Sequence, residues 1–348
     1  MSKIPVAILG ATGIVGQRFI EMLDGHPWFE IAALVGSGRS SGKTYREAAN
    51  WVLANDPPER VLDMPVLPLS VEIPGRIAFS ALPTDIARTI EADFASAGFV
   101  VCSNAAAYRL EPDVPVIIPE INADHLQMLE SQRRRGWKGL IVTSPNCTTT
   151  GITMAIAPLH KAFKVNRLMA TSFQAVSGAG YPGVPFLAIQ DNVIPFIPGE
   201  EEKMEKETRL LLAQMVKGER REAEITVSAQ ANRVAVIHGH TVCISVGFES
   251  RPTVEEAQEA IISFRGSEAV QKLPNAPVCP VILRQEVDRP QPRQDRDLDN
   301  GMVCTVGRLR PCPILDLRLV SVTHNAIRGA AGGSVLNAEL LKAEGYIQ

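Results

Sequence analysis

Val6-Ala7-Ile8-Leu9-Gly10-Ala11-Thr12-Gly13-Ile14-Val15-Gly16 is the stretch that decides the fold at the start of the chain. Its first four residues are apolar and predict a short buried strand. Val15, Phe19, Met22 and Leu23 then recur at helical spacing. A strand, a glycine turn and a helix form a dinucleotide-binding loop, in which backbone N–H groups at the helix N-terminus hold a pyrophosphate. Because the spacing is G-x-x-G-x-x-G, not G-x-G-x-x-G, a tight turn without a ligand is the alternative.

The second strand indicates which dinucleotide would bind. It covers Ile31–Val35 and is followed by Gly36-Ser37-Gly38-Arg39-Ser40-Ser41-Gly42-Lys43. NAD enzymes commonly place a carboxylate here to hold the ribose 2′-hydroxyl. This turn has none, whereas the serines, Arg39 and Lys43 could hold a 2′-phosphate. The turn therefore favours NADP, with a polar surface loop as the alternative.

Strands and helices alternate through the first part of the chain, which predicts an α/β fold with a Rossmann-like, doubly wound parallel sheet. The further strands expected in this part are 77–80, 99–102, 116–118 and the apolar run 139–142, with a helix over 84–97. Later segments predict a second, α+β domain with a mixed, mostly antiparallel sheet. Its expected strands are 168–175, 224–229, 241–248 and 315–322, and its helices are about 201–216 and 253–265.

These patterns divide the chain into two domains. We expect a nucleotide-binding domain over 1–145 and a catalytic and dimerisation domain over 146–324. The segment 325–348 contains an amphipathic helix that should return to the first domain. Residues 284–299 are charged and almost without apolar side chains, so they predict a long exposed loop, ordered by a partner subunit.

Composition excludes several classes of function. The 348 residues are 45% hydrophobic with a formal net charge of −3, which gives no reason to expect nucleic-acid binding. No apolar run approaches the length of a membrane span. The six cysteines are scattered and form no C-x-x-C pair, so we expect neither a metal site nor disulfides. A reducing, cytoplasmic location fits this cysteine usage.

Ser144-Pro145-Asn146-Cys147-Thr148-Thr149-Thr150-Gly151 is the stretch most suited to chemistry. It follows an apolar strand, and helical spacing begins after it, so Cys147 should lie at a helix N-terminus. That position favours a thiolate, and a nearby base would favour it further, so we expect a lowered pKa for Cys147. A buried structural cysteine is the alternative. Ser80 and Asn104 should follow strand C-termini, where such sheets bind ligands, with Arg109 close by.

Taken together, these stretches resemble the aspartate-semialdehyde dehydrogenase family, and most closely its archaeal and fungal branch. The resemblance covers nearly the whole chain. It includes the nucleotide loop 10–16, the turn 37–43 and the cysteine motif 144–149. It continues in Gln174-Ala175-Val176-Ser177-Gly178-Ala179-Gly180, in Glu200 with Lys203, and in Arg233 with His240.

The resemblance assigns roles to these residues. Cys147 would be the nucleophile, His240 the general base and Gln174 an orienting group. Arg233 would clamp the substrate carboxylate, Glu200 would face its ammonium group, and Asn146 would also contact substrate. Asn104, Arg109 and Lys203 would form a phosphate site. NADP would contact Gly10, Thr12, Gly13, Ile14, Val15, Gly16, Ser37, Arg39, Ser40, Lys43, Ser80, Ser177, Gly178 and Asn325. By spacing alone, His238 is as good a candidate base as His240.

The activity implied is the NADP- and phosphate-dependent oxidation of L-aspartate 4-semialdehyde to 4-aspartyl phosphate through a cysteine thioester. In its reductive direction this reaction belongs to lysine, threonine and methionine biosynthesis. The resemblance also implies a homodimer or homotetramer. A malonyl-CoA reductase on the same scaffold is one alternative, which Asn146, Glu200 and Lys203 argue against. A non-catalytic nucleotide-binding regulator is the other, and the retained catalytic side chains argue against it.

Overall fold

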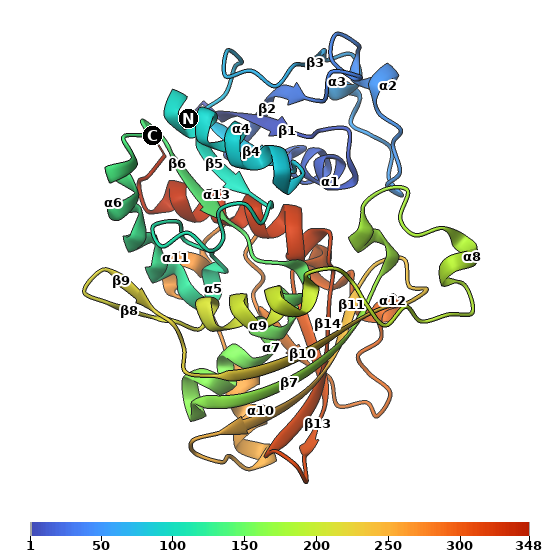
Figure 1. The fold of residues 1–348 in the computed structure, drawn as a ribbon, viewed down its shortest axis with the longest axis vertical. Coiled ribbons are helices and arrows are strands. Elements are labelled where there is room, and N and C mark those ends of the chain that lie inside the picture. Colours follow the sequence, from blue (N-terminus) through green and yellow to red (C-terminus); the bar gives the residue numbers. More distant parts are fainter. Residues whose placement is uncertain (1, 348) are drawn as a thin grey trace.

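A computed structural model describes residues 2–347, so the outermost residues of the expected segments, 1 and 348, lie outside it. Six parallel strands form the first sheet in the order β3-β2-β1-β4-β5-β6 (Figure 1). The strands are β1 (Ile4–Leu9), β2 (Phe29–Val35), β3 (Val66–Leu67), β4 (Ile77–Ser80), β5 (Val100–Ser103) and β6 (Leu140–Thr143).

Helices cover both faces of this sheet, as the alternating pattern predicts. Along β1, Val6 and Ile8 face a cluster that includes Phe19 of α1 (Ile14–Leu23). Leu9 faces the opposite cluster, which includes Phe94 of α4 (Thr84–Ala97). The doubly wound parallel sheet expected from the sequence is confirmed.

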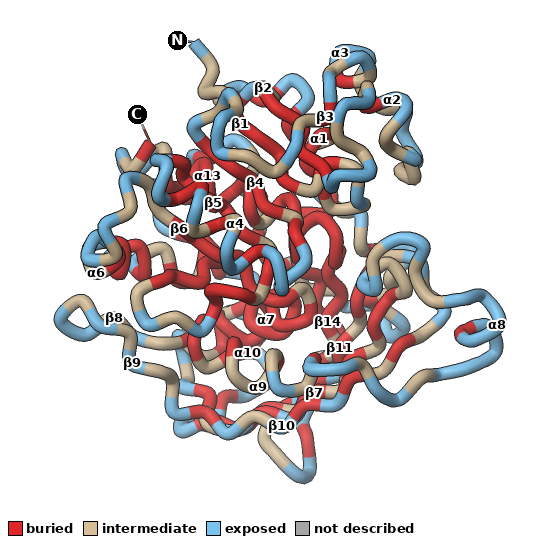
Figure 2. Tube along the Cα trace, turned by 45° about the horizontal axis from the view of Figure 1, so that its top comes forward, coloured by how far each residue is buried: buried red, intermediate tan, exposed pale blue. Residues whose placement is uncertain are grey.

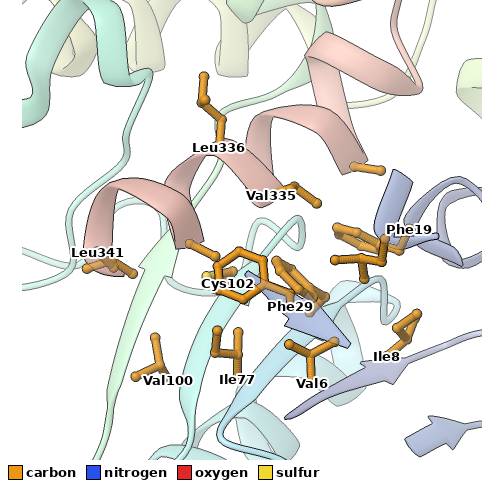
Figure 3. Close-up of a cluster of buried hydrophobic side chains, with 14 of the residues drawn as sticks. Val6, Ile8, Phe19, Phe29, Ile77, Val100, Cys102, Val335, Leu336 and Leu341 are labelled. Atoms are coloured by element: carbon orange, nitrogen blue, oxygen red, sulfur yellow. The ribbon is translucent and has the colours of Figure 1, made fainter. Parts of the chain in front are cut away.

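The C-terminal helix α13 (Gly332–Ala343) lies on the same face as α1. Figure 3 shows Val335, Leu336 and Leu341 of this helix above Phe29 and Cys102 of the first sheet. The last helix of the chain therefore completes the core that the first strands begin.

The second sheet is mixed and has the order β10-β7-β11-β14-β13-β12. Three of its five neighbouring pairs are antiparallel, namely β7–β11, β11–β14 and β14–β13. Its strands are β7 (Val165–Gln174), β10 (Thr226–Arg233), β11 (His240–Phe248), β12 (Val281–Leu283), β13 (Cys304–Pro311) and β14 (Leu317–Thr323).

Three helices cover one face of the second sheet: α7 (Cys147–Phe163), α9 (Glu200–Leu211) and α10 (Val254–Ser263). Figure 2 shows that buried residues form a continuous region from the first sheet through α7 to β14. The shorter helices are α2 (Tyr45–Ala48), α3 (Glu59–Leu62), α5 (Pro119–Asn122), α6 (Leu129–Gln132), α8 (Phe186–Ile189), α11 (Glu268–Gln271) and α12 (Pro292–Asp295). No helix within residues 2–347 is long and apolar enough to cross a membrane.

Several expected elements differ in the structure. Residues 116–118 form no strand, because Pro115 precedes them and Pro119 opens α5, and only Val116 makes an isolated bridge to Thr143. The helix expected over 201–216 ends at Leu211. The chain then forms a hairpin of β8 (Gln214–Val216) and β9 (Glu219–Arg221), whose turn residues Lys217 and Gly218 both have positive φ.

The charged segment 284–299 is less open than expected. Asp295 is buried, and its carboxylate accepts hydrogen bonds from Arg284, Arg289 and the backbone N–H of Gln291. The expectation of an exposed loop is therefore wrong at its centre, where ion pairs within the chain order the segment.

Candidate active site

Cys147 is the first residue of α7, directly after β6, as the sequence predicts. The side chain of Asn146 caps this helix, and its Oδ1 accepts hydrogen bonds from Thr148 N at 2.9 Å and Thr149 N at 3.1 Å. The cap fixes the first turn of α7, and with it the starting point of the Cys147 side chain.

His240 is the histidine that reaches the thiol. It begins β11, and its Nε2 lies 3.3 Å from Sγ of Cys147. Its Nδ1 accepts the backbone N–H of Ala175 at 3.0 Å, so the neutral ring carries its proton on Nε2, toward the sulfur. His238, equal by spacing, instead bonds Ser177 Oγ at 2.8 Å.

Burial dominates the protonation of this pair. It raises the pKa of the Cys147 thiol to about 12, and the negative charge of Glu200 adds to the shift. Burial also lowers the pKa of His240 to about 3, with the positive charge of Arg233 acting in the same direction. The lowered thiol pKa expected from the helix terminus is therefore wrong for the protein without ligands, whose resting pair is a thiol and a neutral imidazole.

Glu200 is the centre of a buried polar cluster at the start of α9. Its carboxylate accepts from Asn146 Nδ2 at 2.9 and 3.0 Å, from Gln174 Nε2 at 3.2 Å and from Lys203 Nζ at 3.0 Å. Burial acts to raise the pKa of Glu200, but Lys203 and these hydrogen bonds outweigh it, so the net shift is downward. Glu200 is therefore a carboxylate anion next to the thiol.

Arg233 approaches the same centre from the end of β10. Its Nη1 donates to the backbone carbonyl of Ala175 at 2.8 Å, and burial lowers its pKa. A Cβ on Gly178 would lie 2.8 Å from Nη1 of Arg233 and 3.1 Å from Cε1 of His240, so only glycine leaves both side chains in place. The structure thus brings together Cys147, Gln174, Glu200, Arg233 and His240.

Arg109 does not extend into open space. It is 6% exposed, and all three of its side-chain nitrogens donate: Nε to Ser144 O at 2.8 Å, Nη1 to Glu207 Oε1 at 3.0 Å and Nη2 to Asn104 O at 2.6 Å. These bonds use three of the five guanidinium N–H groups, and the expected phosphate contact stays a prediction. Glu207 was not among the sequence candidates, although it lies seven residues after Glu200 and hence near the same helix face.

The glycine turn fits a dinucleotide phosphate. No side chain caps the N-terminus of α1, so its first backbone N–H groups are not occupied by one. A Cβ on Gly16 would lie 2.3 Å from Gly10 O, which explains why glycine is required there. Arg39 and Lys43 are exposed after β2, whereas the Ser80 side chain is fully buried, against its expected contact with a cofactor.

A second set of bonds joins the expected cofactor residues of the second domain. Asn325 Nδ2 donates to Ser177 Oγ at 2.9 Å, and Asn325 Oδ1 accepts the backbone N–H of Gly239 at 2.9 Å. The loop after β7, the residues before β11 and the segment after β14 are therefore held side by side next to His240.

Comparisons with known proteins give the family. Residues 5–129 match the model "Semialdehyde dehydrogenase, NAD binding domain", and residues 156–328 match "Semialdehyde dehydrogenase, dimerisation domain". Both sheets are therefore those of a semialdehyde dehydrogenase. More narrowly, relatives that match over nearly the whole length show that the chain belongs to the aspartate-semialdehyde dehydrogenase family, as the resemblance implies.

Two relatives support this assignment, and a third is the alternative enzyme on the same scaffold. The chain is 50% identical to the aspartate-semialdehyde dehydrogenase of Methanothermobacter thermautotrophicus, over 97% of this chain and 98% of that one. The crystal structure of the Candida albicans aspartate semialdehyde dehydrogenase with NADP has a TM-score of 0.92 and 40% identity, covering 99% of this chain and 100% of the other. The malonyl CoA reductase (NADP) of Metallosphaera sedula is 41% identical over 98% of this chain and 97% of its own.

Proposed function

We propose that this protein is an NADP-dependent aspartate-semialdehyde dehydrogenase that forms 4-aspartyl phosphate through a thioester on Cys147. One observation carries the proposal: a cysteine at a helix N-terminus lies 3.3 Å from a buried histidine, and a buried carboxylate and a buried arginine lie around them. A nucleophile, a proton donor and two groups of opposite charge are what an amino-acid aldehyde requires.

The geometry supports His240 as a hydrogen-bond donor during the reaction. The neutral ring already carries a proton on Nε2, so it cannot accept one there while Ala175 donates to Nδ1. The thiol proton is released to water as Sγ attacks the aldehyde. Nε2–H of His240 stabilises the thiolate that forms, and after the sulfur adds to the aldehyde the same N–H donates to the resulting alkoxide. The general-base role expected from the family requires the other tautomer, in which the bond from Ala175 is lost.

The remaining steps use the other side chains. Arg233 holds the substrate carboxylate and Glu200 its ammonium group, which aims the aldehyde carbon at Sγ. Bound NADP supplies the hydride acceptor. Loss of hydride from the alkoxide leaves a thioester, and attack by phosphate releases the acyl phosphate and the Cys147 thiolate. We assign phosphate to Lys203, Arg109 and Asn104.

The cofactor assignment has its own support. The uncapped helix α1 suits a pyrophosphate, and Arg39, Ser37, Ser40 and Lys43 suit a 2′-phosphate. The residues expected near the nicotinamide are Ser177, Gly178 and Asn325, and the hydrogen bond between Asn325 and Ser177 preorganises that side of the site.

We also propose a homodimer built on the face of the second sheet that helices leave open. Along β7, Arg167 and Met169 are exposed and Thr171 is half-buried, whereas Leu168 and Ala170 are buried under helices. The matching family model is a dimerisation domain, which supports this assignment. The exposed side chains Phe186 and Leu187, on the projecting segment around α8 (Figure 1), supply the second surface that a homotetramer requires.

Two further expectations stay within the proposal. We place the nucleotide-binding domain at 1–145 and the catalytic and dimerisation domain at 146–324, and we assign 325–348 to the first domain because α13 packs there. We also retain the cytoplasmic location, which the six free cysteines fit. The place in lysine, threonine and methionine biosynthesis is retained from the family.

Acylation of Cys147 tests the proposal. Enzyme, NADP and aspartate semialdehyde are mixed without phosphate, denatured and analysed by mass spectrometry, and we expect the acyl adduct on the peptide that contains Cys147. Cys147→Ser should retain NADP binding and lose nearly all turnover, because a serine hydroxyl is a far weaker nucleophile near neutrality. An adduct on another cysteine, or normal activity in Cys147→Ser, contradicts the mechanism.

Substrate choice separates the two enzymes of this scaffold. We compare NADP reduction with aspartate semialdehyde and phosphate against NADPH oxidation with malonyl-CoA. Asn146, Gln174 and Lys203 all bond Glu200, which favours a substrate with an ammonium group. Faster turnover of malonyl-CoA would overturn the substrate assignment, and turnover of neither would favour a regulator.

A further inference from the structure

One buried ion pair holds both ends of the loop that precedes the nucleophile. We call Ser144–Asn146 the nucleophile loop. Arg109 Nε donates to the carbonyl of Ser144 at 2.8 Å, and Glu207 Oε2 accepts the backbone N–H of Asn146 at 2.6 Å. The two side chains also bond each other, Arg109 Nη1 to Glu207 Oε1, at 3.0 Å.

The pair is shielded from water and joins distant parts of the chain. The side chains of Arg109 and Glu207 are 8% and 3% exposed. Arg109 follows β5 of the first sheet, and Glu207 lies on α9, which covers the second sheet. Because low exposure limits screening by solvent, this charge pair can hold the loop more firmly than a surface pair would.

Each contact acts on backbone just before Cys147: Glu207 binds Asn146, one residue earlier, and Arg109 binds Ser144, three residues earlier. The N–H of Asn146 meets a carboxylate, while the Asn146 side chain caps α7 with Oδ1 and bonds Glu200 with Nδ2. A change at Glu207 would therefore move the cap, and the cap sets where Cys147 points. Misplacement of a reacting group by about 1 Å can cost on the order of 100-fold in rate.

We propose that Glu207 is a positioning residue for Cys147, with Arg109 as its partner: the pair fixes the nucleophile loop and so aims the sulfur at the substrate. The inference rests on the proposed role of Cys147 as nucleophile. It gives Arg109 a role in addition to phosphate binding, because three of its five N–H groups serve Glu207, Ser144 and Asn104.

The test uses Glu207→Gln, a change of nearly equal size. The amide oxygen can still accept the N–H of Asn146, but its NH₂ group would then face Nη1 of Arg109, donor against donor. The matched control is Glu202→Gln, an exposed position on the same helix. Rates are expressed per active site, counted as Cys147 acylated in the absence of phosphate, so that a partly unfolded sample does not lower them.

We expect Glu207→Gln to reduce kcat per acylated site by about 100-fold, with unchanged KM for NADP, and Glu202→Gln to match the wild type. The rate at which iodoacetamide labels Cys147 in Glu207→Gln should also differ from the wild-type rate between pH 7 and 9, because the sulfur moves relative to His240. Arg109→Gln should lower the rate in a similar way. The double variant should be no slower than the slower single variant, because the two residues act as a unit.

Wild-type kcat per site in Glu207→Gln would overturn the inference, as would losses that multiply in the double variant. If Arg109→Gln raises KM for phosphate and leaves kcat per site unchanged, the inference is also overturned, because Arg109 would then bind phosphate without positioning the nucleophile loop. If Glu207→Gln does not fold, Glu207→Asp is judged by the same criteria, since it keeps the charge but is too short for both contacts. A wrong assignment of Cys147 as the nucleophile gives a different result, namely full activity in Cys147→Ser.

Discussion

Glu200 has two effects at the scale of a single residue, and the second can be measured without substrate. Its carboxylate suits a substrate ammonium group, and its charge raises the pKa of Cys147. Glu200→Gln removes that charge, so the thiol pKa should fall and the thiolate fraction at a fixed pH below it should rise. The gain is about tenfold for each unit of pKa.

The measurement is the rate of alkylation of Cys147 by iodoacetamide in the protein without ligands, at pH 7, 8 and 9. We expect Glu200→Gln to react several-fold faster than the wild type at each pH, although turnover of aspartate semialdehyde falls. Glu202→Gln is the control, because it removes a charge at an exposed position of the same helix. Slower labelling in Glu200→Gln would show that the carboxylate acts on Cys147 mainly through Asn146.

Single residues differ in how far the sequence predicts them. Cys147 follows from its position between a strand and a helix. By spacing, His240 and His238 are equal candidates for the base, and only the structure distinguishes them, because the start of β11 places the His240 ring against the sulfur. The bond between Arg109 and Glu207 joins residues 98 positions apart, so no local pattern could indicate it. The thiol pKa was mispredicted because burial raises it, and the burial of Cys147 depends on the whole fold.

At the scale of elements, the turn after β2 should decide between NADP and NAD. Arg39 is exposed at the end of this strand, and a guanidinium binds a phosphate through two N–H groups. Arg39→Ala should raise KM for NADP by at least about tenfold while KM for NAD changes little. Steady-state kinetics with both cofactors give the ratio.

Arg46→Ala is the control for this experiment, since Arg46 lies on the neighbouring α2 and pairs with Asp63 at the surface. Equal effects of Arg39→Ala on both cofactors, or a wild-type preference for NAD, would contradict the assignment of the turn.

The π-helical turn Ile327–Ala331 packs against Cys147. A Cβ on Gly329 would lie 2.7 Å from Cβ and 2.9 Å from Cα of Cys147, so Gly329→Ala must displace one backbone or the other. We expect kcat per acylated site to fall by about 100-fold with NADP binding retained, measured by acylation counting and cofactor titration. Full activity would show that the turn yields without moving Cys147.

Helices and strands whose apolar residues recur with a clear period were predicted well. Strands that form mainly by pairing with neighbouring strands were not. The strands around the glycine turn and the helices α4 and α10 follow from apolar periodicity. Strand β13 was missed, since Cys-Thr-Val-Gly-Arg-Leu-Arg-Pro has no strong alternation, and it forms by pairing with β12 and β14. The apolar run 116–118 is buried beside β6 without joining the sheet as a strand, because prolines flank it.

At the scale of the whole molecule, the C-terminal segment joins the two sheets. Arg328, in the π-helical turn, pairs with Glu120 near the first sheet, and both side chains are 1% exposed. Ser334 Oγ lies 2.8 Å from Ser144 Oγ, so α13 also contacts the nucleophile loop. The return of the last helix to the first domain was predicted from its amphipathic pattern. These buried pairs were not, because they require both domains to be in place.

The open face of the second sheet leads to the last prediction, which concerns assembly. In the paired register, Met169 lies between Ser228 of β10 and Ser245 of β11, and 53% of its surface is exposed. If a second copy covers this face, Met169→Lys places a charge in an apolar contact, and the cost of burying an unpaired ammonium group should dissociate the dimer. Sedimentation velocity should then detect single chains where the wild type sediments as two or more. The control is Ile86→Lys on α4, an exposed apolar position on the other domain, which should leave the assembly unchanged. An unaltered assembly in Met169→Lys would exclude this face and direct attention to the segment around α8, where Leu187 is 90% exposed.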